Sequence, residues 1–177
     1  SALVATSSAG RWMEELPYRF GIYSTFWIIW LQIVGARTMQ PGFSGDFSDL
    51  SAIDWEWVTM QRPLRDQDLA IGRLDSVWRE WLKHQTYDDY WHDISCKGQF
   101  HKIDVPVLHI TGWFDGNDFN GDQMGQFFYW HGMLESSPAA ERQWLLAGPW
   151  DHGGTGNPQQ RFGERDFGPH SVLDMNE

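Results

Sequence analysis

Two short apolar runs in the second half of the chain predict buried strands. The first, "VPVLHIT" (105–111), is rich in β-branched residues and runs into Gly112, and the second is "RQWLLAGP" (142–149). About 37 residues separate the two strand starts, and the segment between them has helical spacing. Strand, helix and strand in this order predict a βαβ unit with parallel strands. One face of the predicted helix would carry Met124, Phe127, Phe128 and Met133.

The first half of the chain has a different pattern. Residues 2–6, "ALVAT", predict one further buried strand, whereas residues 10–98 are rich in tryptophan and charge and are expected to be mostly helical. Within them, Phe20–Ala36 is a run of 17 uncharged residues. That is the lower limit for a membrane span, about 17–25 residues. Because the run contains polar residues such as Gln32, a buried or cleft-lining helix is the preferred interpretation.

Helix starts can also be placed further along this half. The segment before residue 51 is dense in Pro, Gly, Ser and Asp, as loops are, so a helix is expected to begin after Ser51 or Asp54. An amphipathic helix is expected later, because apolar residues recur there at helical spacing. These residues are Val77, Trp78, Trp81 and Leu82.

Composition limits the class of protein. The 177 residues suffice for one core, since a domain takes about 100–200 residues. A formal net charge of −11 would repel a phosphate backbone, which makes nucleic acid a poor partner. The single Cys96 forms no internal disulfide, and the cellular compartment stays open. The N-terminus lacks a signal-peptide pattern, and both ends suggest an internal piece of a longer polypeptide.

Aromatic residues are unusually frequent, with 12 Trp, 11 Phe and 5 Tyr. This exceeds what a core of this size needs, so many of them are expected to line a groove, a lid or an interface. Which of them face a ligand cannot be read from the pattern. The candidates for pocket walls in the helical half are Trp27, Trp30, Trp55, Trp57, Trp78 and Trp81.

Candidate catalytic groups follow both predicted strands. The first strand runs into "GWFD", which ends in Asp115, and the second runs into "GPWDHGG", which contains His152. In parallel α/β sheets the reactive groups lie in loops beyond the carboxyl ends of the strands. Asp115 and His152 should therefore meet at one edge of the sheet. A carboxylate on one imidazole nitrogen orients the ring, so that the other nitrogen can accept a proton from a nucleophile.

A nucleophile is harder to place. In α/β-hydrolases the triad follows the order Ser, Asp, His, with the serine in a G-x-S-x-G turn between strand and helix. The segment "PGFSGDF" contains Ser44, but Asp46 stands where the motif needs glycine, and no buried strand precedes it. The serine is therefore expected upstream, outside this chain.

The residues at the strand ends resemble a known family. "VPVLHITGWFDGN" and "WLLAGPWDHGG" are similar to the acid and base motifs, G-W-[YF]-D and G-P-W-x-H, of the serine hydrolases that include cocaine esterase, α-amino acid ester hydrolase and Xaa-Pro dipeptidyl-peptidase. "KHQTYDDYWHDIS" and "ERDFGPHSVLD" also look like segments of this family. The family's G-x-S-Y-x-G nucleophile motif, its oxyanion tyrosine and its C-terminal jelly-roll domain find no match in the chain.

The resemblance implies a fold and a domain organisation. The expected class is α/β, a partial α/β-hydrolase fold with the C-terminal part of the parallel sheet and a helical cap insertion. Residues 1–9 would be a core strand, 10–98 the cap, and 99–177 the C-terminal part of the core. The resemblance also implies Asp115 as the triad acid and His152 as the general base.

The implied function is hydrolysis of an ester or amide bond, of the acyl, aminoacyl or X-prolyl type, with no cofactor and no metal. Expected partners are a small ester or amide, or a short peptide, together with the remainder of the polypeptide. An oligomer is possible; a membrane or a nucleic acid is not expected. The 177 residues alone should be inactive and poorly soluble, because the sheet would lack neighbours on one side.

Other functions remain open at this point. The stretch "GWFDGNDFNGDQ" (112–123) is rich in oxygen donors but does not fit the EF-hand pattern, and its middle part is expected to cap the following helix through Asn117, Asp118 and Asn120. No zinc-ligand spacing is present. The remaining histidines are interpreted as structural or surface residues. These are His84, His92, His101, His109, His131 and His170.

A carbohydrate-binding or carbohydrate-active protein is the main alternative. Its basis is the tryptophan density and the "DWEW" segment, in which Asp54 and Glu56 flank Trp55. Glycosidases do use two carboxylates, but residues two apart on a helix point in different directions. A noncatalytic interaction module is a third possibility, in which Asp115 and His152 would stand together by coincidence.

Overall fold

The fold of the chain is given by a computed structural model, which describes residues 1–34, 48–115 and 122–174. It is a mixed α/β structure with helices and a parallel three-stranded sheet. Among the described helices, none combines the length and the apolar character that crossing a bilayer requires.

The chain divides into two compact units. The first comprises residues 1–16 and 91–177, and the second comprises residues 17–90. The second unit falls within the region 10–98, for which a helical cap was predicted. That assignment of a cap stays a prediction, because a compact unit is not by itself a cap.

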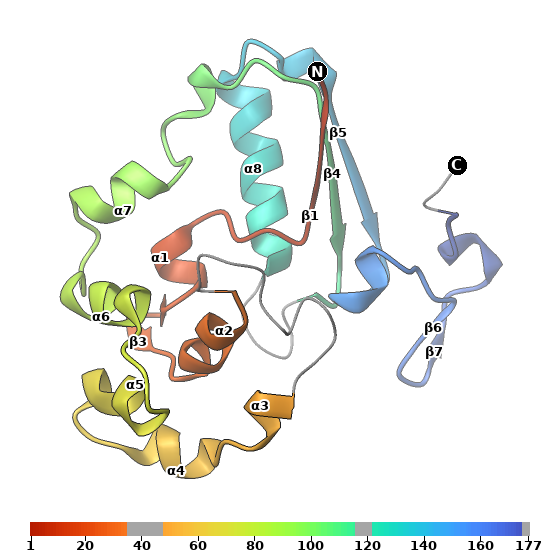
Figure 1. The fold of residues 1–177 in the computed structure, drawn as a ribbon. Coiled ribbons are helices and arrows are strands. Elements are labelled where there is room, and N and C mark those ends of the chain that lie inside the picture. Colours follow the sequence, from red (N-terminus) through yellow and green to blue (C-terminus); the bar gives the residue numbers. More distant parts are fainter. Residues whose placement is uncertain (35–47, 116–121, 175–177) are drawn as a thin grey trace. The chain divides into compact units, whose positions relative to one another are not determined.

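The first unit is built on the predicted βαβ arrangement. Its strands are β1 (Leu3–Thr6), β4 (Val107–Gly112) and β5 (Gln143–Gly148), which lie in the order β1-β4-β5 and pair in parallel. Helix α8 (Asp122–Ser136) connects β4 to β5 and packs against both (Figure 1). The prediction of parallel strands joined by a helix is therefore confirmed. The strand predicted at residues 2–6 is present as β1, but it is not buried as predicted, because Leu3 and Val4 are 51% and 62% exposed.

Short elements complete this part of the chain, one of which, α7, begins in the last two residues of the second unit. They are α1 (Trp12–Glu15), α7 (Asp89–Ile94), η3 (Phe100–Lys102), η4 (Ala140–Arg142), η5 (Gly153–Thr155), β6 (Arg161–Phe162), β7 (Arg165–Asp166) and η6 (Pro169–Ser171). Strands β6 and β7 form an antiparallel hairpin.

The buried face of α8 differs in part from the predicted one. Met133 is buried and joins Phe100 and Val107 in the apolar core of the first unit. Met124 is 49% exposed, whereas Gln126 is completely buried. The polar Gln126 faces the sheet because it lies within hydrogen-bond distance of His109 on β4, which hydrophobicity alone could not indicate.

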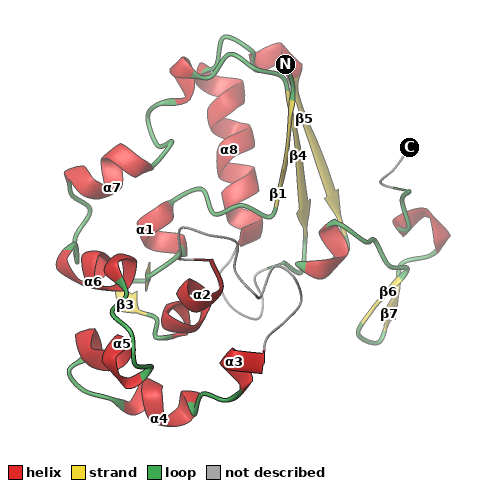
Figure 2. Cartoon of the chain, viewed as in Figure 1, coloured by secondary structure: helices red, strands yellow, loops and turns green. Residues whose placement is uncertain are grey.

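The second unit is mostly helical, as predicted (Figure 2). Its elements are β2 (Tyr18–Arg19), β3 (Ile22–Tyr23), α2 (Phe26–Val34), α3 (Ser48–Ser51), α4 (Trp55–Met60), η2 (Leu64–Asp66), α5 (Gln67–Ala70) and α6 (Ser76–Lys83).

The long uncharged run Phe20–Ala36 is not one helix from its beginning. β2 and β3 pair as a tight antiparallel hairpin, and Phe20 lies in its turn with a φ of 53° and 91% exposure. Gly21 follows at a φ of 78°, a conformation that glycine adopts without strain. The helix within this run, α2, therefore begins only at Phe26. The prediction of a buried helix holds for Trp27, Ile28 and Leu31.

Three of the tryptophans expected as pocket walls belong to the core of the second unit. Trp27, Trp78 and Trp81 are 2%, 0% and 4% exposed, and the Trp27 and Trp81 rings pack edge to face at 6.1 Å. Trp30 and Trp57 are the more exposed ones, at 38% and 52%. In a unit made of short helices, large aromatic side chains supply the apolar area that the helices themselves lack.

A buried ion pair links α5 to α6. The Asp68 carboxylate is completely buried and accepts two hydrogen bonds from the Arg79 guanidinium, at 2.6 and 2.8 Å, and one from the Asp75 main chain. Burial works against the charged carboxylate, but the hydrogen bonds from Arg79 and Asp75 hold the pKa of Asp68 below its usual range.

Candidate active site

The candidate site lies where β4 and β5 end side by side. The two strands pair in register up to Gly112 on β4 and Gly148 on β5. Both loops that follow therefore leave the sheet at the same edge, as the predicted parallel pairing requires. This places "WFD" next to "PWDH".

The two loops are joined by main-chain hydrogen bonds beyond the ends of the strands. The Trp113 amide donates to the Gly148 carbonyl at 2.8 Å, and the Phe114 amide donates to the Trp150 carbonyl at 3.0 Å. The approach is so close that a Cβ on Gly112 would lie 2.0 Å from the Trp150 oxygen. Only glycine fits at this position, and the loops are fixed relative to each other by their own backbones.

Asp115 and His152 meet in this arrangement. His152 Nδ1 lies 3.0 Å from Asp115 Oδ1. The Asp115 side chain is completely buried, whereas the His152 side chain is 60% exposed. Since an ionised carboxylate only accepts hydrogen bonds, Nδ1 carries the proton in this contact and Nε2 is the nitrogen directed elsewhere. The contact expected from the topology is present; the catalytic role of the pair stays a prediction.

Further hydrogen bonds shape the turn that carries His152. The Asp151 carboxylate accepts from the Gly154 amide at 2.7 Å, and the Thr155 hydroxyl donates to the His152 carbonyl at 2.8 Å. Trp150, which is 3% exposed, donates from its indole to the Ser171 carbonyl at 2.9 Å. The turn is thus held on both sides of the histidine.

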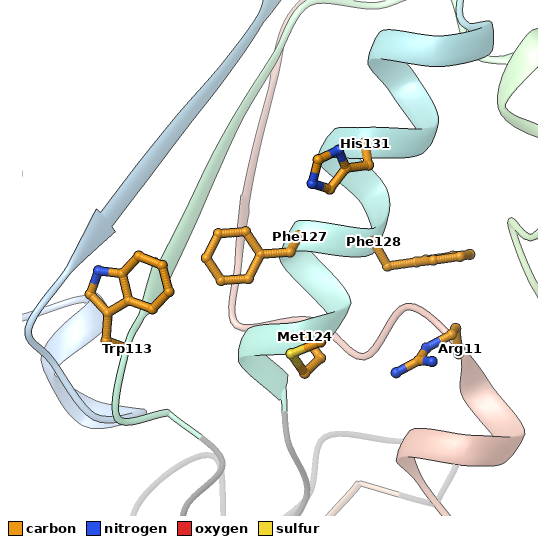
Figure 3. A pocket seen from close by; sticks show the side chains of 6 residues that line it. All are labelled: Arg11, Trp113, Met124, Phe127, Phe128 and His131. Atoms are coloured by element: carbon orange, nitrogen blue, oxygen red, sulfur yellow. The ribbon is translucent and has the colours of Figure 1, made fainter.

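An apolar pocket of about 500 Å³ lies elsewhere in the first unit. Most of its lining comes from α8, and Trp113, from the loop that also carries Asp115, faces Phe127 with ring centroids 5.2 Å apart (Figure 3). Arg11 lies at its border and donates from Nε to the buried Glu15 carboxylate at 2.8 Å. Neither this pocket nor a role for Arg11 was predicted from the sequence. The lining residues are Arg11, Trp113, Met124, Phe127, Phe128 and His131.

The "DWEW" carboxylates are explained by helix structure. Asp54 is the N-cap of α4, and its side chain accepts from the Trp57 amide at 2.9 Å. Of the two predicted helix starts, Ser51 and Asp54, the second is the correct one, since Ser51 ends α3. Glu56 is exposed in the first turn of the same helix. Asp54 caps a helix and Glu56 faces solvent, so these two carboxylates do not form the paired acid site that a glycosidase would use.

Two of the other histidines have clear structural partners. His109 is 2% exposed, with Nδ1 3.3 Å from Gln126 Oε1 and Nε2 3.1 Å from Gln143 Oε1. His84 Nδ1 lies 2.6 Å from a carboxylate oxygen of Asp88. His131 borders the apolar pocket. Apart from His152, the exposed histidines are His92, His101, His131 and His170.

Several predicted residues lie outside the described part of the chain. These are Ser44, whose fit to a nucleophile motif was poor, and the predicted helix-capping residues Asn117, Asp118 and Asn120. Within residues 1–34, 48–115 and 122–174, no group of three or more His, Cys, Asp or Glu side chains is arranged to hold a metal ion.

Comparisons with known proteins agree with the motifs at the strand ends. The model of the X-Pro dipeptidyl-peptidase (S15) family matches residues 34–154. The fold is similar to a crystal structure of an aminopeptidase from the marine sediment archaeon Thaumarchaeota archaeon, with a TM-score of 0.62 and 18% sequence identity. The match covers 94% of this chain and 27% of that one, so the chain spans about a quarter of the length of this structural relative. A comparison with curated proteins found no match.

Proposed function

Because the chain belongs to the X-Pro dipeptidyl-peptidase (S15) family, we propose that it is part of a serine hydrolase that cleaves ester or amide bonds. In this proposal Asp115 and His152 are the acid and base of a Ser-His-Asp triad. The order of the triad in α/β-hydrolases places the serine before Asp115. We place it upstream of Ser1, because the segment around Ser44 fits the G-x-S-x-G motif poorly.

The same proposal includes the fold. Strands β1, β4 and β5 would be the C-terminal part of the parallel sheet of an α/β-hydrolase, with residues 10–98 as its helical cap and 99–177 as the rest of the core. β1 has a hydrogen-bonded neighbour on one side, β4, and its Leu3 and Val4 are 51% and 62% exposed. Such an edge is suited to pairing with a further strand.

One observation carries the proposal: the buried Asp115 carboxylate contacts the imidazole of His152 at 3.0 Å, at the carboxyl ends of adjacent parallel strands. A buried carboxylate holding Nδ1 stabilises the imidazolium that forms during the reaction and keeps Nε2 in the tautomer that accepts a proton. The exposure of His152 would let a serine and a substrate reach Nε2.

The proposed reaction uses the serine, His152 and Asp115 in two acyl-transfer steps. The serine oxygen attacks the substrate carbonyl carbon while its proton passes to His152 Nε2. The imidazolium, held by Asp115, then gives this proton to the leaving alcohol or amine as the bond to the acyl carbon breaks. Water activated by the same nitrogen attacks the acyl enzyme, and the serine departs with its proton restored.

We place the substrate within four types: simple esters, α-amino acid esters, acyl amides and X-prolyl peptides. The chain's net charge of −11 favours substrates with a free amine, but salt screens such an effect beyond a Debye length of about 10 Å. A panel of these four substrates with the complete enzyme would identify the class.

The proposal is tested by replacing His152 with alanine in the complete enzyme. We expect kcat on a nitrophenyl ester to fall by about 10⁴-fold or more. His101→Ala, at an exposed histidine on η3, is the matched control and should keep the parent rate. The parent enzyme should also be labelled by a fluorophosphonate probe, which reacts with activated serines.

Two results would contradict the proposal. One is a His152→Ala enzyme that hydrolyses every substrate of the panel at the parent rate. The other is a parent enzyme that neither reacts with the fluorophosphonate nor cleaves any of the four substrates.

A further inference from the structure

The position of the His152 backbone strongly affects the orientation of its side chain. This dependence is greater than for a histidine enclosed by other side chains. The His152 side chain is 60% exposed, so packing does not surround the ring. A shift of the main chain at residue 152 would move the ring relative to the buried carboxylate of Asp115. What holds that main chain therefore matters for the geometry of the pair.

A chain of two hydrogen bonds, from Ser7 to Thr155 and from Thr155 to the main chain, ends at His152. Thr155 Oγ1 donates to the His152 carbonyl at 2.8 Å, and Ser7 Oγ donates to Thr155 Oγ1 at 2.9 Å. The direction is fixed by chemistry. A carbonyl only accepts, so the single hydroxyl hydrogen of Thr155 is used there, and Thr155 can only accept from Ser7.

Both hydroxyls are set in constrained positions. Thr155 is 4% exposed and lies in η5, immediately after the histidine. Ser7 directly follows β1, and its amide donates to the Ile110 carbonyl on β4 at 3.1 Å. Ser7 also has a φ of 46°, a conformation that is uncommon outside glycine.

An unfavourable backbone conformation persists only where the surroundings maintain it, and such residues cluster at functional sites. At Ser7 it turns the side chain at the end of β1 toward η5. The hydroxyl then connects the strand to a residue 148 positions away in the sequence. The two hydroxyls thus anchor the His152 turn to the sheet after the histidine, whereas the hydrogen bond between Phe114 and Trp150 anchors it before the histidine.

We propose that Thr155 and Ser7 are positioning residues, which hold the His152 main chain so that the imidazole keeps its contact with Asp115. Neither would touch the substrate. The inference rests on the proposed function, since it assigns these hydroxyls to the base of that same site.

The decisive substitution is Thr155→Val in the complete enzyme, because valine keeps the shape of threonine and removes its hydroxyl. We expect kcat to fall by about 10- to 100-fold, the scale of a misplaced catalytic group, with KM unchanged. Thr155→Ser retains the hydroxyl and should restore most of the rate. Rates are expressed per active site, counted by fluorophosphonate labelling carried to completion.

Ser7→Ala provides the second arm. It removes the donor to Thr155 and should lower kcat by less than Thr155→Val does. Combined with Thr155→Val it should cause no further loss, because the path from Ser7 to the His152 carbonyl is already broken. Independent effects would add instead.

The outcomes separate this inference from the function on which it rests. Loss of activity in His152→Ala together with a parent-like kcat per active site in Thr155→Val would overturn the positioning role alone. A role limited to stability would lower the amount of labelled enzyme and leave kcat per labelled site unchanged, which also overturns it. Full activity in His152→Ala would instead overturn the proposed function.

Discussion

Replacing Gly112 with alanine should push apart the loops that carry Asp115 and His152. Gly112 ends β4, and a Cβ at this position would lie 2.0 Å from the Trp150 main-chain oxygen and 2.6 Å from its carbonyl carbon. Both are backbone atoms, so no side chain can rotate away to make room. One loop has to move relative to the other.

The size of the movement follows from these distances. Ordinary contact begins at 3.4 Å, which is 1.4 Å more than the 2.0 Å available. If half of that displacement reaches the pair, the distance between His152 Nδ1 and Asp115 Oδ1 grows from 3.0 Å to about 3.7 Å, too long for a hydrogen bond. Displacement of a catalytic group by about 1 Å costs about 10²-fold, and loss of the correct tautomer about 10⁴-fold. We therefore expect kcat/KM of Gly112→Ala to fall by 10²- to 10⁴-fold.

The assay is ester hydrolysis by the complete enzyme. Overpacking also costs about 1–3 kcal/mol of stability, so the unfolding midpoint is measured first and rates are taken well below it. Gly156→Ala is the matched control: nothing lies within 4 Å of its Cβ position, and its φ is −105°. A folded Gly112→Ala enzyme with the kcat/KM of Gly156→Ala would refute the reasoning.

Two further predictions concern the second unit and the surface. Asp68→Ala removes the buried carboxylate that accepts hydrogen bonds from Arg79 and from the Asp75 amide, and leaves Arg79 with its longer contact to Asp66 at 3.9 Å. We expect the free energy of unfolding to fall by about 2–3 kcal/mol. Asp104→Ala, in an exposed ion pair, should cost under about 1 kcal/mol, and equal losses in urea denaturation would contradict this. The hydrogen bond that His84 donates to the Asp88 carboxylate raises the pKa of His84 in the folded protein. The stabilisation from this contact is therefore complete below the unfolded pKa of 6.5 and is lost as the pH rises through the folded pKa. The difference in unfolding midpoint between the parent and His84→Gln, measured over a pH series, should therefore decrease as the pH rises. A difference that does not change with pH would contradict this prediction.

The parts of this molecule that the sequence predicted well are those determined by neighbouring residues. β4 and β5 are short apolar runs that end in glycine, and their parallel pairing follows from the helix between them. The placement of Asp115 beside His152 needed nothing more than this pairing. The start of α4 after Asp54 was one of two alternatives that residue types within one turn allowed, the other being Ser51.

The parts that could not be predicted depend on contacts between distant segments. Gln126 is buried on α8 because His109 on β4 supplies a polar partner, so a hydrophobic pattern assigned the wrong neighbour, Met124, to the buried face. Ser7 and Thr155 are 148 positions apart, and neither residue type is distinctive in its own segment. The only local sign at Ser7 is its backbone conformation, which no residue letter encodes.

In the segment "GPWDH", which contains His152, Gly148 and Trp150 serve the packing of the turn. A Cβ on Gly148 would lie 2.3 Å from the indole of Trp150, so glycine at the end of β5 makes room for that ring. The ring is 3% exposed and anchored to the Ser171 carbonyl, while the main-chain oxygen of the same residue accepts from Phe114. Trp150 thus fixes the turn through both its side chain and its backbone, two residues before His152. The residues around His152 can therefore be required to position its side chain rather than for chemistry of their own. Substitutions at Trp150 should act on the candidate site only through the placement of the imidazole.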